Sequence, residues 1–267
     1  MIDPVSAGAG VHPYMVRQAD ALRRYRGPAL RAEEDAVHRM RVATRRLRSL
    51  LSTFGPLYAD TPLSRKRLRW LTAELGEVRD LEVLRMRFAA ELGRDRPDWF
   101  GALESAERGA YRSLARSFGR PRFARLMAEA DAMAAEPRFS LEAVEPAAEV
   151  LGPVLASAES DLEASFGAIA SARDPDAARH RARKTAKRVR YTAEAAAPAL
   201  GDRAEALAAE AKRLQTLSGR CQDGVVAVAY LEAHTDPGEE HRERVLVEER
   251  RRRQRDLAAL EAARAAR

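Results

Sequence analysis

The sequence HRMRVATRRLR, at residues 38–48, returns later in the chain as HRARKTAKRVR, at residues 180–190. About half of the 267-residue chain separates the two copies. The positions that are basic in both copies include Arg41, Arg45, Arg46 and Arg48, and Arg183, Lys187, Arg188 and Arg190. We call the two stretches the first and the second basic stripe. Their duplication predicts two similar structural halves.

Each stripe has the pattern of an amphipathic α-helix. A helix turns about 100° per residue, so positions 0, 3, 7 and 10 from each histidine fall within roughly 80° of one another. The histidine and three cations therefore share one face. The other face of the first copy is apolar, with Met40, Ala43, Leu47, Leu50, Leu51 and Phe54. One face is suited to burial and the other to holding positive charge.

The duplication continues beyond the stripes. The segment LGEVRDLEVL, at residues 75–84, matches SGRCQDGVVA, at residues 218–227, through a shared glycine and aspartate. In the same alignment Arg69 matches Lys212, which adds another basic position to both copies.

The composition favours an all-α protein. Alanine, arginine, leucine and glutamate dominate, aromatic residues make up 6% of the chain, and runs of β-branched residues are absent. The net charge of +7 indicates an anionic partner only where the charge is clustered. It is clustered here, because residues 36–49 and 179–191 contain many basic residues and no acid.

The sequence favours a cytoplasmic protein. A single cysteine, Cys221, excludes an intramolecular disulfide and suits a reducing compartment. We expect it to be buried. The N-terminal residues lack the charged and apolar regions of a signal peptide. No apolar run approaches the roughly 18 residues that a membrane span needs.

Helix-start and helix-stop signals divide the chain. The expected helices span residues 13–25, 31–54, 61–75, 81–92, 98–118, 123–135, 141–170, 175–197, 202–217 and 239–267. Expected breaks are Gly27-Pro28, the segment from Gly76 to Asp80, Gly152-Pro153 and Pro198. We expect a disordered leader over residues 1–10, a first helical repeat over 11–138 and a second over 139–267.

The two stripes predict a site for a polyanion. If they face each other across a pseudo-two-fold axis, their cations line a basic central cavity, where they cannot remain unpaired. Arginine contacts phosphate oxygens in a bidentate manner and lysine supplies point charge. Tyr191 could bond a phosphate oxygen or simply pack. The alternative is that the stripes are solvated outer faces of ordinary amphipathic helices.

A metal site at the histidines is a weaker hypothesis. Asp35 precedes His38 by three residues and Asp176 precedes His180 by four, so each pair is within reach on a helix. However, the flanking arginines would repel a cation, and no third ligand lies at metal spacing. The two acids could instead belong to the first turns of their helices. We predict no metal and no cofactor.

Catalytic signatures are missing from the sequence. It has no Gly-rich phosphate loop, no HExxH motif and no paired carboxylates among the cations. We therefore expect a binding protein rather than an enzyme. Trp70 is expected in the core. The run Arg250–Arg253 fits a solvated terminal face, or alternatively a surface that recruits anions.

The residues resemble the CHAD domain family, the conserved-histidine α-helical domain. VHRMRVATRRLR followed by LGEVRDLEVL resembles its first half, and RHRARKTAKRVRY followed by Gln222-Asp223 resembles its second. The resemblance covers residues 13–234 or beyond. It implies two four-helix bundles related by pseudo-two-fold symmetry around a basic cavity. It also implies binding of inorganic polyphosphate, association with polyphosphate granules, and no catalysis by the domain.

The resemblance and the repeat together give the expected site. The predicted polyphosphate-binding residues are His38, Arg41, Arg45, Arg46, Arg48, Arg69, His180, Arg183, Lys184, Lys187, Arg188, Arg190 and Lys212. The second glycine–aspartate segment, SGRCQDGVVA, departs from the family's fuller LG-x-x-RD pattern. The ExExK signature of the CYTH triphosphatase domain that often accompanies this family does not occur.

Two other functions use the same cations. A nucleic-acid-binding protein is one, although few aromatics are interleaved with the basic residues and no familiar reading helix is evident. A metal-dependent phosphoanhydride hydrolase is the other. We expect inorganic polyphosphate or a similar polyanion as the partner, with no membrane and no specific nucleic acid.

Overall fold

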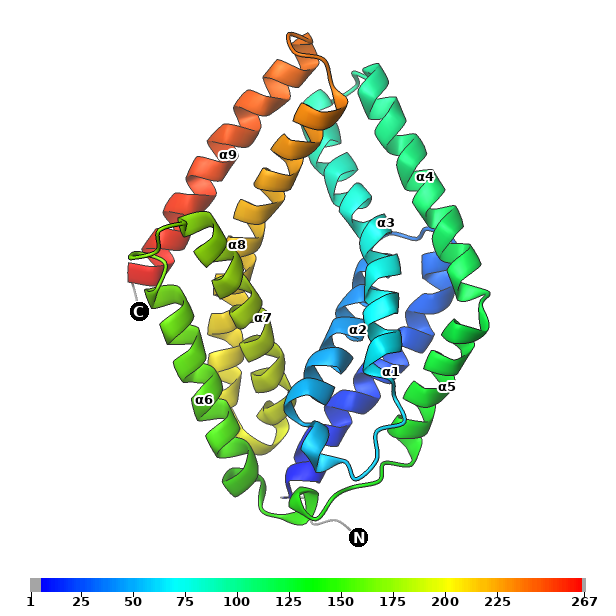
Figure 1. Ribbon diagram of the computed structural model, residues 1–267, viewed down its shortest axis with the longest axis vertical. Helices are drawn as coiled ribbons and strands as arrows, with labels where there is room; N and C mark the ends of the chain where they lie inside the picture. The colour runs from blue at the N-terminus through cyan, green and yellow to red at the C-terminus, as the bar shows by residue number, and fades with distance from the viewer. Residues whose placement is uncertain (1–5, 266–267) are drawn as a thin grey trace. The chain divides into compact units, whose positions relative to one another are not determined.

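The computed structural model describes residues 6–265, and within them the chain is α-helical (Figure 1). The α-helices are α1 (Ala7–Leu30), α2 (Ala36–Thr53), α3 (Arg65–Leu92), α4 (Asp98–Phe118), α5 (Pro121–Ala135), α6 (Ala147–Gly167), α7 (Pro175–Leu200), α8 (Asp202–His234) and α9 (Glu240–Ala265). Two short 3-10 helices, η1 (Gly55–Leu57) and η2 (Glu142–Val144), lie in the connections. The prediction of an all-α fold is confirmed.

The chain divides into two compact units. Unit 1 comprises Met1–Arg79, Ala110–Asp161 and Arg188–Ala209, and unit 2 comprises Asp80–Gly109, Leu162–Lys187 and Glu210–Arg267. The boundaries fall inside α3, α4, α6, α7 and α8, so each unit takes segments from both halves of the sequence. The predicted repeats over 11–138 and 139–267, their pseudo-two-fold symmetry and the central cavity therefore stay predictions.

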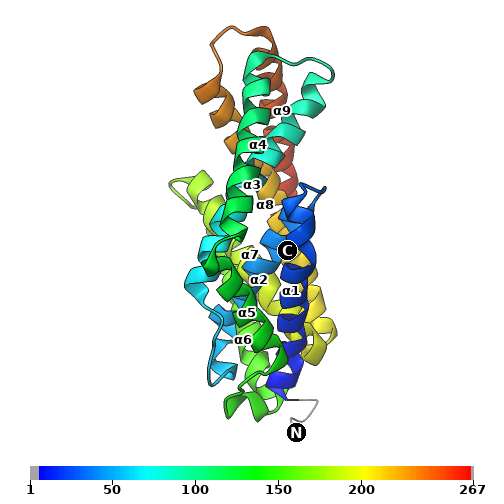
Figure 2. The same cartoon turned by 90° about the vertical axis from the view of Figure 1, so that its right-hand side faces the viewer.

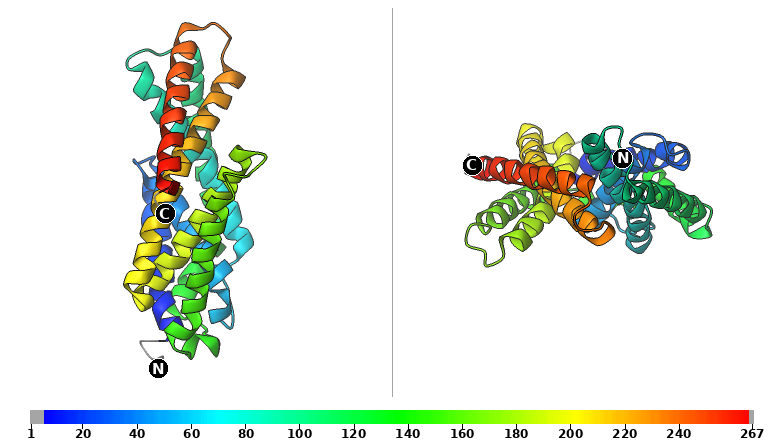
Figure 3. Two further views of the ribbon diagram at one scale, coloured as in Figure 1. Left: turned by 90° about the vertical axis from the view of Figure 1, so that its left-hand side faces the viewer. Right: turned by 90° about the horizontal axis from the view of Figure 1, so that it is seen from above.

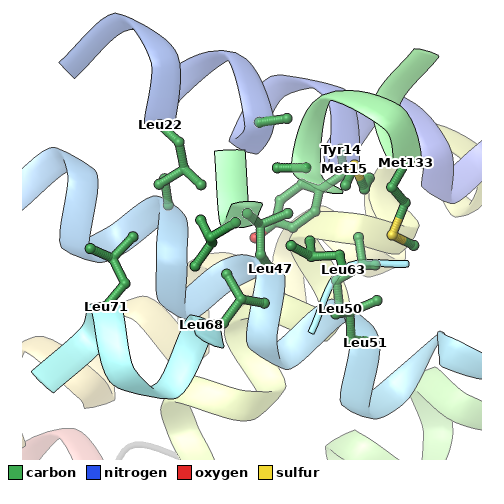
Figure 4. Close-up of a cluster of buried hydrophobic side chains, with 14 of the residues drawn as sticks. Tyr14, Met15, Leu22, Leu47, Leu50, Leu51, Leu63, Leu68, Leu71 and Met133 are labelled. Carbon is green, nitrogen blue, oxygen red and sulfur yellow. The ribbon is translucent and has the colours of Figure 1, made fainter. Parts of the chain in front are cut away.

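The core of unit 1 forms where α1, α2, α3 and α5 pack together. The apolar face predicted for the first basic stripe is buried as expected, from Met40 to Phe54. Figure 4 shows Leu22 of α1, Leu47 of α2 and Leu71 of α3 pointing into one cluster. Truncating a buried leucine of this kind to alanine costs about 2–5 kcal/mol of stability, so these contacts fix the orientation of α2.

Unit 2 has a separate apolar core. Phe88 of α3 lies edge-on to Trp99 of α4, and Ala227, Leu231, Val245 and Leu246 complete the cluster from α8 and α9. Residues 93–97 join α3 to α4 as antiparallel neighbours (Figure 2). α8 and α9 also run side by side (Figure 3).

The predicted disordered leader is wrong over residues 6–10. The side chain of Ser6 accepts a hydrogen bond from the backbone N–H of Ala9 and caps α1, whose first residues, from Ala7 to Gly10, are largely buried. Residues 1–5 of that leader lie outside the described residues. The sequence AGAG in this region is helical because it packs against neighbouring residues, which its low intrinsic preference could not reveal.

Two glycine–proline pairs did not interrupt helices as expected. α1 continues through Gly27-Pro28 to Leu30, and α6 continues through Gly152-Pro153 without the predicted interruption. Proline's own φ fits a helix, and its ring disfavours the helical conformation of the preceding residue partly through that residue's Cβ. Glycine has no Cβ, which reduces this conflict. α7 likewise runs past Pro198 to Leu200.

The acids before the first stripe precede α2 instead of forming its first turn. α2 begins at Ala36 rather than near Arg31, and Asp35 stands before it in the left-handed region, at φ 62°. Ser64 caps α3, where its hydroxyl accepts a hydrogen bond from the backbone N–H of Arg67. Asp174 caps α7, since its carboxylate accepts from the backbone N–H of Ala177.

The expected break between Gly76 and Asp80 is wrong. α3 is a single helix of 28 residues, and α8, with 33 residues, continues through the matching segment. The predictions for α4 and α5 are confirmed to within two residues. Trp70 packs against the core of unit 1 and Cys221 is buried, both as expected.

Candidate anion-binding site

The first basic stripe lies on α2 in unit 1. His38, Arg41, Arg45, Arg46 and Arg48 are all half-buried, and the apolar face behind them is fully packed. The packed apolar face therefore fixes the direction in which these side chains leave α2.

Arg45 and Arg48 belong to a cluster of arginines. Burial lowers the pKa of Arg48, and the positive charges of Arg69, Arg45 and Arg65 lower it further. Among residues 6–265, none of these four arginines forms an ion pair with a carboxylate. The repulsion among them would be relieved by a bound anion, so this cluster is the strongest anion-attracting feature of unit 1.

The arginine three residues after each histidine packs against a glycine. A Cβ added at Gly76 would lie 3.6 Å from Nε of Arg41, and one added at Gly219 would lie 3.7 Å from Nε of Arg183. The glycines shared by the two copies thus allow a guanidinium to approach the surface of the next helix closely. The glycine shared by both copies therefore marks a helix–helix contact with this arginine and not a helix break.

Arg46 and Arg190 converge on one carboxylate. Arg46 Nη2 lies 2.8 Å from Oε2 of Glu194, and Arg190 Nε lies 2.7 Å from Oε1 of the same residue. The hydroxyl of Tyr14 donates to Glu194 as well, at 3.1 Å. Burial and the charge of Glu194 raise the pKa of Tyr14. This network links α1, α2 and α7 within unit 1.

Tyr191 belongs to the same network as a packing residue. It is buried, and the guanidinium groups of Arg46 and Arg190 lie 5.7 Å and 5.8 Å from the centre of its ring. Cation–π contacts of this kind orient arginine side chains. Of the two roles considered for Tyr191, packing is the one observed.

The second basic stripe crosses from unit 2 into unit 1. His180, Arg183, Lys184 and Lys187 lie in unit 2 with Lys212, whereas Arg188 and Arg190 lie in unit 1. Nδ1 of His180 lies 3.2 Å from Oε1 of Gln222, and its N–H donates to this oxygen. The other ring nitrogen, Nε2, takes no part in this hydrogen bond. Lys184 and Lys212 are exposed, and Arg188 is paired with Asp161 at 2.7 Å.

The acids considered as metal partners are engaged by arginines. Asp35 accepts from Arg39 at 3.0 Å. Asp176 is bound by Arg179 and Arg253, and these two arginines lower its pKa despite the opposing effect of partial burial. Searching the described residues reveals no group of three His, Cys, Asp or Glu side chains that could hold a metal ion.

The Arg250–Arg253 run is only partly a solvated face. Arg252 pairs with Glu91, and Arg253 pairs with Asp176 at 2.9 Å, so these two residues attach α9 to the rest of unit 2. Arg250 and Arg251 are exposed. The expectation of a terminal face that is solvated throughout is therefore wrong for Arg252 and Arg253.

Sequence reasoning missed two residues of the site. Arg65 lies one helical turn before Arg69, a spacing that could have placed it beside the predicted residues. Glu194 lies one turn after Arg190, just outside the acid-free stretch. Its pairing with Arg46, however, joins residues far apart in the sequence, and no local pattern indicates such a contact.

The geometry can be compared with known proteins. The family model of the CHAD domain matches residues 14–232. The chain belongs to the CHAD domain family. Two curated relatives from Mycobacterium tuberculosis, the uncharacterized proteins MT2285 (strain CDC 1551 / Oshkosh) and Rv2226 (strain ATCC 25618 / H37Rv), are each 34% identical over 220 residues. This alignment covers 76% of the CHAD domain chain and 41% of each relative, so the chain spans about two fifths of their length.

Two solved structures share the fold of this CHAD domain. PptA from Streptomyces chartreusis has a TM-score of 0.75 at 19% identity, and the match covers 97% of this chain and 99% of that one. The CHAD domain from the plant Ricinus communis has a TM-score of 0.71 at 23% identity, covering 98% and 93%. Within residues 6–265, no helix of the CHAD domain combines the length and apolarity that crossing a bilayer requires.

Proposed function

We propose that this CHAD domain binds inorganic polyphosphate without catalysis, and that binding brings the protein to polyphosphate granules in the cytoplasm. The observation that carries the proposal is the cluster of Arg45, Arg48, Arg65 and Arg69, four cations with no carboxylate partner among the described residues. Membership of the CHAD family supports the same ligand.

The chemistry of the cations suits a chain of phosphates. Each guanidinium can donate two parallel hydrogen bonds to phosphate oxygens, and a repeating anion can satisfy several guanidinium groups at once. The residues proposed as direct ligands are His38, Arg41, Arg45, Arg48, Arg69, His180, Arg183, Lys184, Lys187 and Lys212. Three further predicted residues, Arg46, Arg188 and Arg190, pair with Glu194 or Asp161 within unit 1. We assign these three a supporting role.

A titration with polyphosphates of defined length at two salt concentrations tests the proposal. The affinity should fall steeply with salt, because binding releases counterions from the polyanion. Reversing two charges, in Arg45→Glu with Lys187→Glu, should abolish binding while the helical content stays unchanged. A matched control reverses two exposed arginines outside the stripes, Arg112→Glu with Arg125→Glu, for the same change in net charge.

Two further arms separate the competing functions. RNA or DNA that displaces a long polyphosphate at equal phosphate concentration would favour a nucleic-acid-binding protein. Shortening of the polyphosphate, or release of phosphate with Mg²⁺ or Mn²⁺, would favour a hydrolase. Survival of binding in the double charge-reversal variant would refute the proposed ligand residues.

A further inference from the structure

The two basic stripes are alike for eleven residues and then diverge. The face that carries Arg45 and Arg48 on α2 continues, one turn later, to Ser52. The equivalent position after the second stripe is Glu194, by the same count from the histidine. A neutral hydroxyl therefore follows the cations in one copy, and a carboxylate follows them in the other.

The residue that meets Ser52 is a cation. Arg65, the first residue of α3, donates from Nη2 to Oγ of Ser52 at 3.4 Å. Since Ser52 accepts in this bond, its own O–H is still able to donate, and among the described residues no acceptor engages it. In Figure 1 the end of α2 and the beginning of α3 are joined by the short segment that contains η1.

Arg65 and Arg69 form one exposed row on α3. They are four residues apart, so they share a helix face. Arg67, between them, faces elsewhere and is bound by Glu129. The position that matches Arg65 in the second copy, four residues before Lys212, is Ala208. The row has two cations in the first copy and one in the second.

The second copy has a carboxylate at the end of its stripe. Glu194 takes both Arg190 and Arg46, and all three side chains are largely buried. At the equivalent end of the first stripe, Ser52 and Arg65 are exposed and no carboxylate follows the cations at that position. Positive charge therefore continues beyond Arg48, whereas a negative charge follows Arg190 and lowers the potential there.

We propose that the polyphosphate path is asymmetric, extending past the first stripe to Ser52 and Arg65 and ending at Glu194 in the second. In this arrangement Arg65 binds phosphate by charge-assisted hydrogen bonds and the Ser52 hydroxyl donates to a phosphate oxygen. The proposal rests on the proposed function and adds two ligands that the duplicated motif does not contain.

Single substitutions at this end of the path test the proposal, with a long polyphosphate of defined length as the probe. Arg65→Ala should raise the Kd about threefold to tenfold at low salt and reduce the slope of log K against log salt by about one. Arg65→Lys should keep the slope. Ser52→Ala removes no charge, so it should weaken binding at an unchanged slope.

Ser52→Glu is the more decisive variant, because it gives the first copy the residue type found at the equivalent position of the second. Ser52→Glu places a carboxylate beside Arg65 and Arg48, and it should weaken binding and lower the salt slope more than Arg65→Ala does. Lys66→Ala is the matched control, because Lys66 is an exposed cation adjacent in sequence but about 100° away around α3. Circular dichroism of each variant verifies the fold.

The outcomes separate this inference from the proposed function. If the wild-type protein does not bind polyphosphate, the proposed function itself fails. If the wild type binds, but Arg65→Ala changes the Kd and the salt slope no more than Lys66→Ala does, the path does not reach Arg65. Binding that is unaffected by Ser52→Glu would also overturn the asymmetric path.

Discussion

At the scale of single residues, the described contacts divide the predicted ligands into two groups. Arg46, Arg188 and Arg190 are held by carboxylates, whereas Arg48 lies near the positive charges of Arg45, Arg65 and Arg69. Sequence periodicity identified the shared face correctly, because it depends only on helix geometry. It could not separate the groups, because Asp161 and Glu194 reach the arginines through tertiary packing.

Gly76 gives a prediction about the packing of Arg41 against α3. A methyl group there would lie 3.6 Å from Nε of Arg41, an ordinary contact distance. Gly76→Ala should therefore leave polyphosphate affinity unchanged and raise the free energy of unfolding by up to about 1 kcal/mol, since glycine is unfavourable inside helices. Gly76→Leu should displace the guanidinium and weaken binding.

Urea unfolding and polyphosphate titration of both variants provide the measurement, with Gly219→Ala as the equivalent change beside Arg183. A loss of stability in Gly76→Ala, or an unaltered affinity in Gly76→Leu, would contradict this description of how Arg41 packs against Gly76.

His12 gives a prediction about pH. Its Nε2–H donates to the carbonyl oxygen of Ala134, Nδ1 lies 3.4 Å from the hydroxyl of Tyr58, and burial lowers its pKa below the ordinary value of 6.5. The unfolded chain therefore binds a proton at higher pH than the folded one. The stability contributed by neutral His12 should be complete above pH 6.5 and should decline as the pH falls below it.

Urea denaturation at pH 7.5 and pH 5 measures this effect. Replacement of His12 by glutamine should reduce the loss of stability at the lower pH, whereas the same change at the exposed His234 should not. An equal loss in the wild type and in His12→Gln would show that other groups cause the pH dependence.

At the scale of the helices, most elements were predictable and several boundaries between them were not. The spacing of apolar residues identified the buried face of α2, and start and stop signals located α4, α5 and the beginning of α7. The errors came from reading Gly76 and Gly152 as breaks. In α3 and in α6 these glycines lie inside continuous helices, and Gly76 packs against the side chain of Arg41.

α9 gives a prediction about a buried ion pair. Glu249 is 0% exposed and accepts from Arg87 of α3, with N–O distances of 2.6–2.7 Å. Glu249→Ala should lower the free energy of unfolding by about 3–5 kcal/mol, because it leaves the guanidinium of Arg87 without its buried partner. Adding Arg87→Met should restore part of the loss.

Thermal or urea unfolding tests this pair, and Arg244→Ala on the same helix is the control. Arg244 pairs with Asp95 at the surface, where ion pairs contribute little, so its removal should leave stability nearly unchanged. A small effect of Glu249→Ala, similar to that of the control, would contradict the prediction.

At the scale of the whole molecule, the two units share helices that each begin in one unit and end in the other. Five helices cross the unit boundaries, which no sequence pattern indicated. The internal repeat, by contrast, was recognised in the sequence because it depends on matched positions rather than on contacts.

This continuity predicts cooperative unfolding, and the two tryptophans can report on it. Trp70 lies in unit 1 and Trp99 lies in unit 2. With Trp99→Phe and Trp70→Phe as single-reporter proteins, the midpoints of the urea transitions should coincide once corrected for the substitutions, because melting one unit would fray helices that the other needs. Two separate transitions would show that the units unfold independently.

The small number of lysines in the chain has a consequence for chemical labelling. The chain has only four, and Lys184, Lys187 and Lys212 are predicted ligands in unit 2, while Lys66 in unit 1 is not. An amine-selective reagent therefore modifies the second copy's cations and leaves the arginines of the first unmodified. Protection of those three amines by a bound polyanion, measured against Lys66 as an internal standard, would report on one copy alone in the unmutated protein.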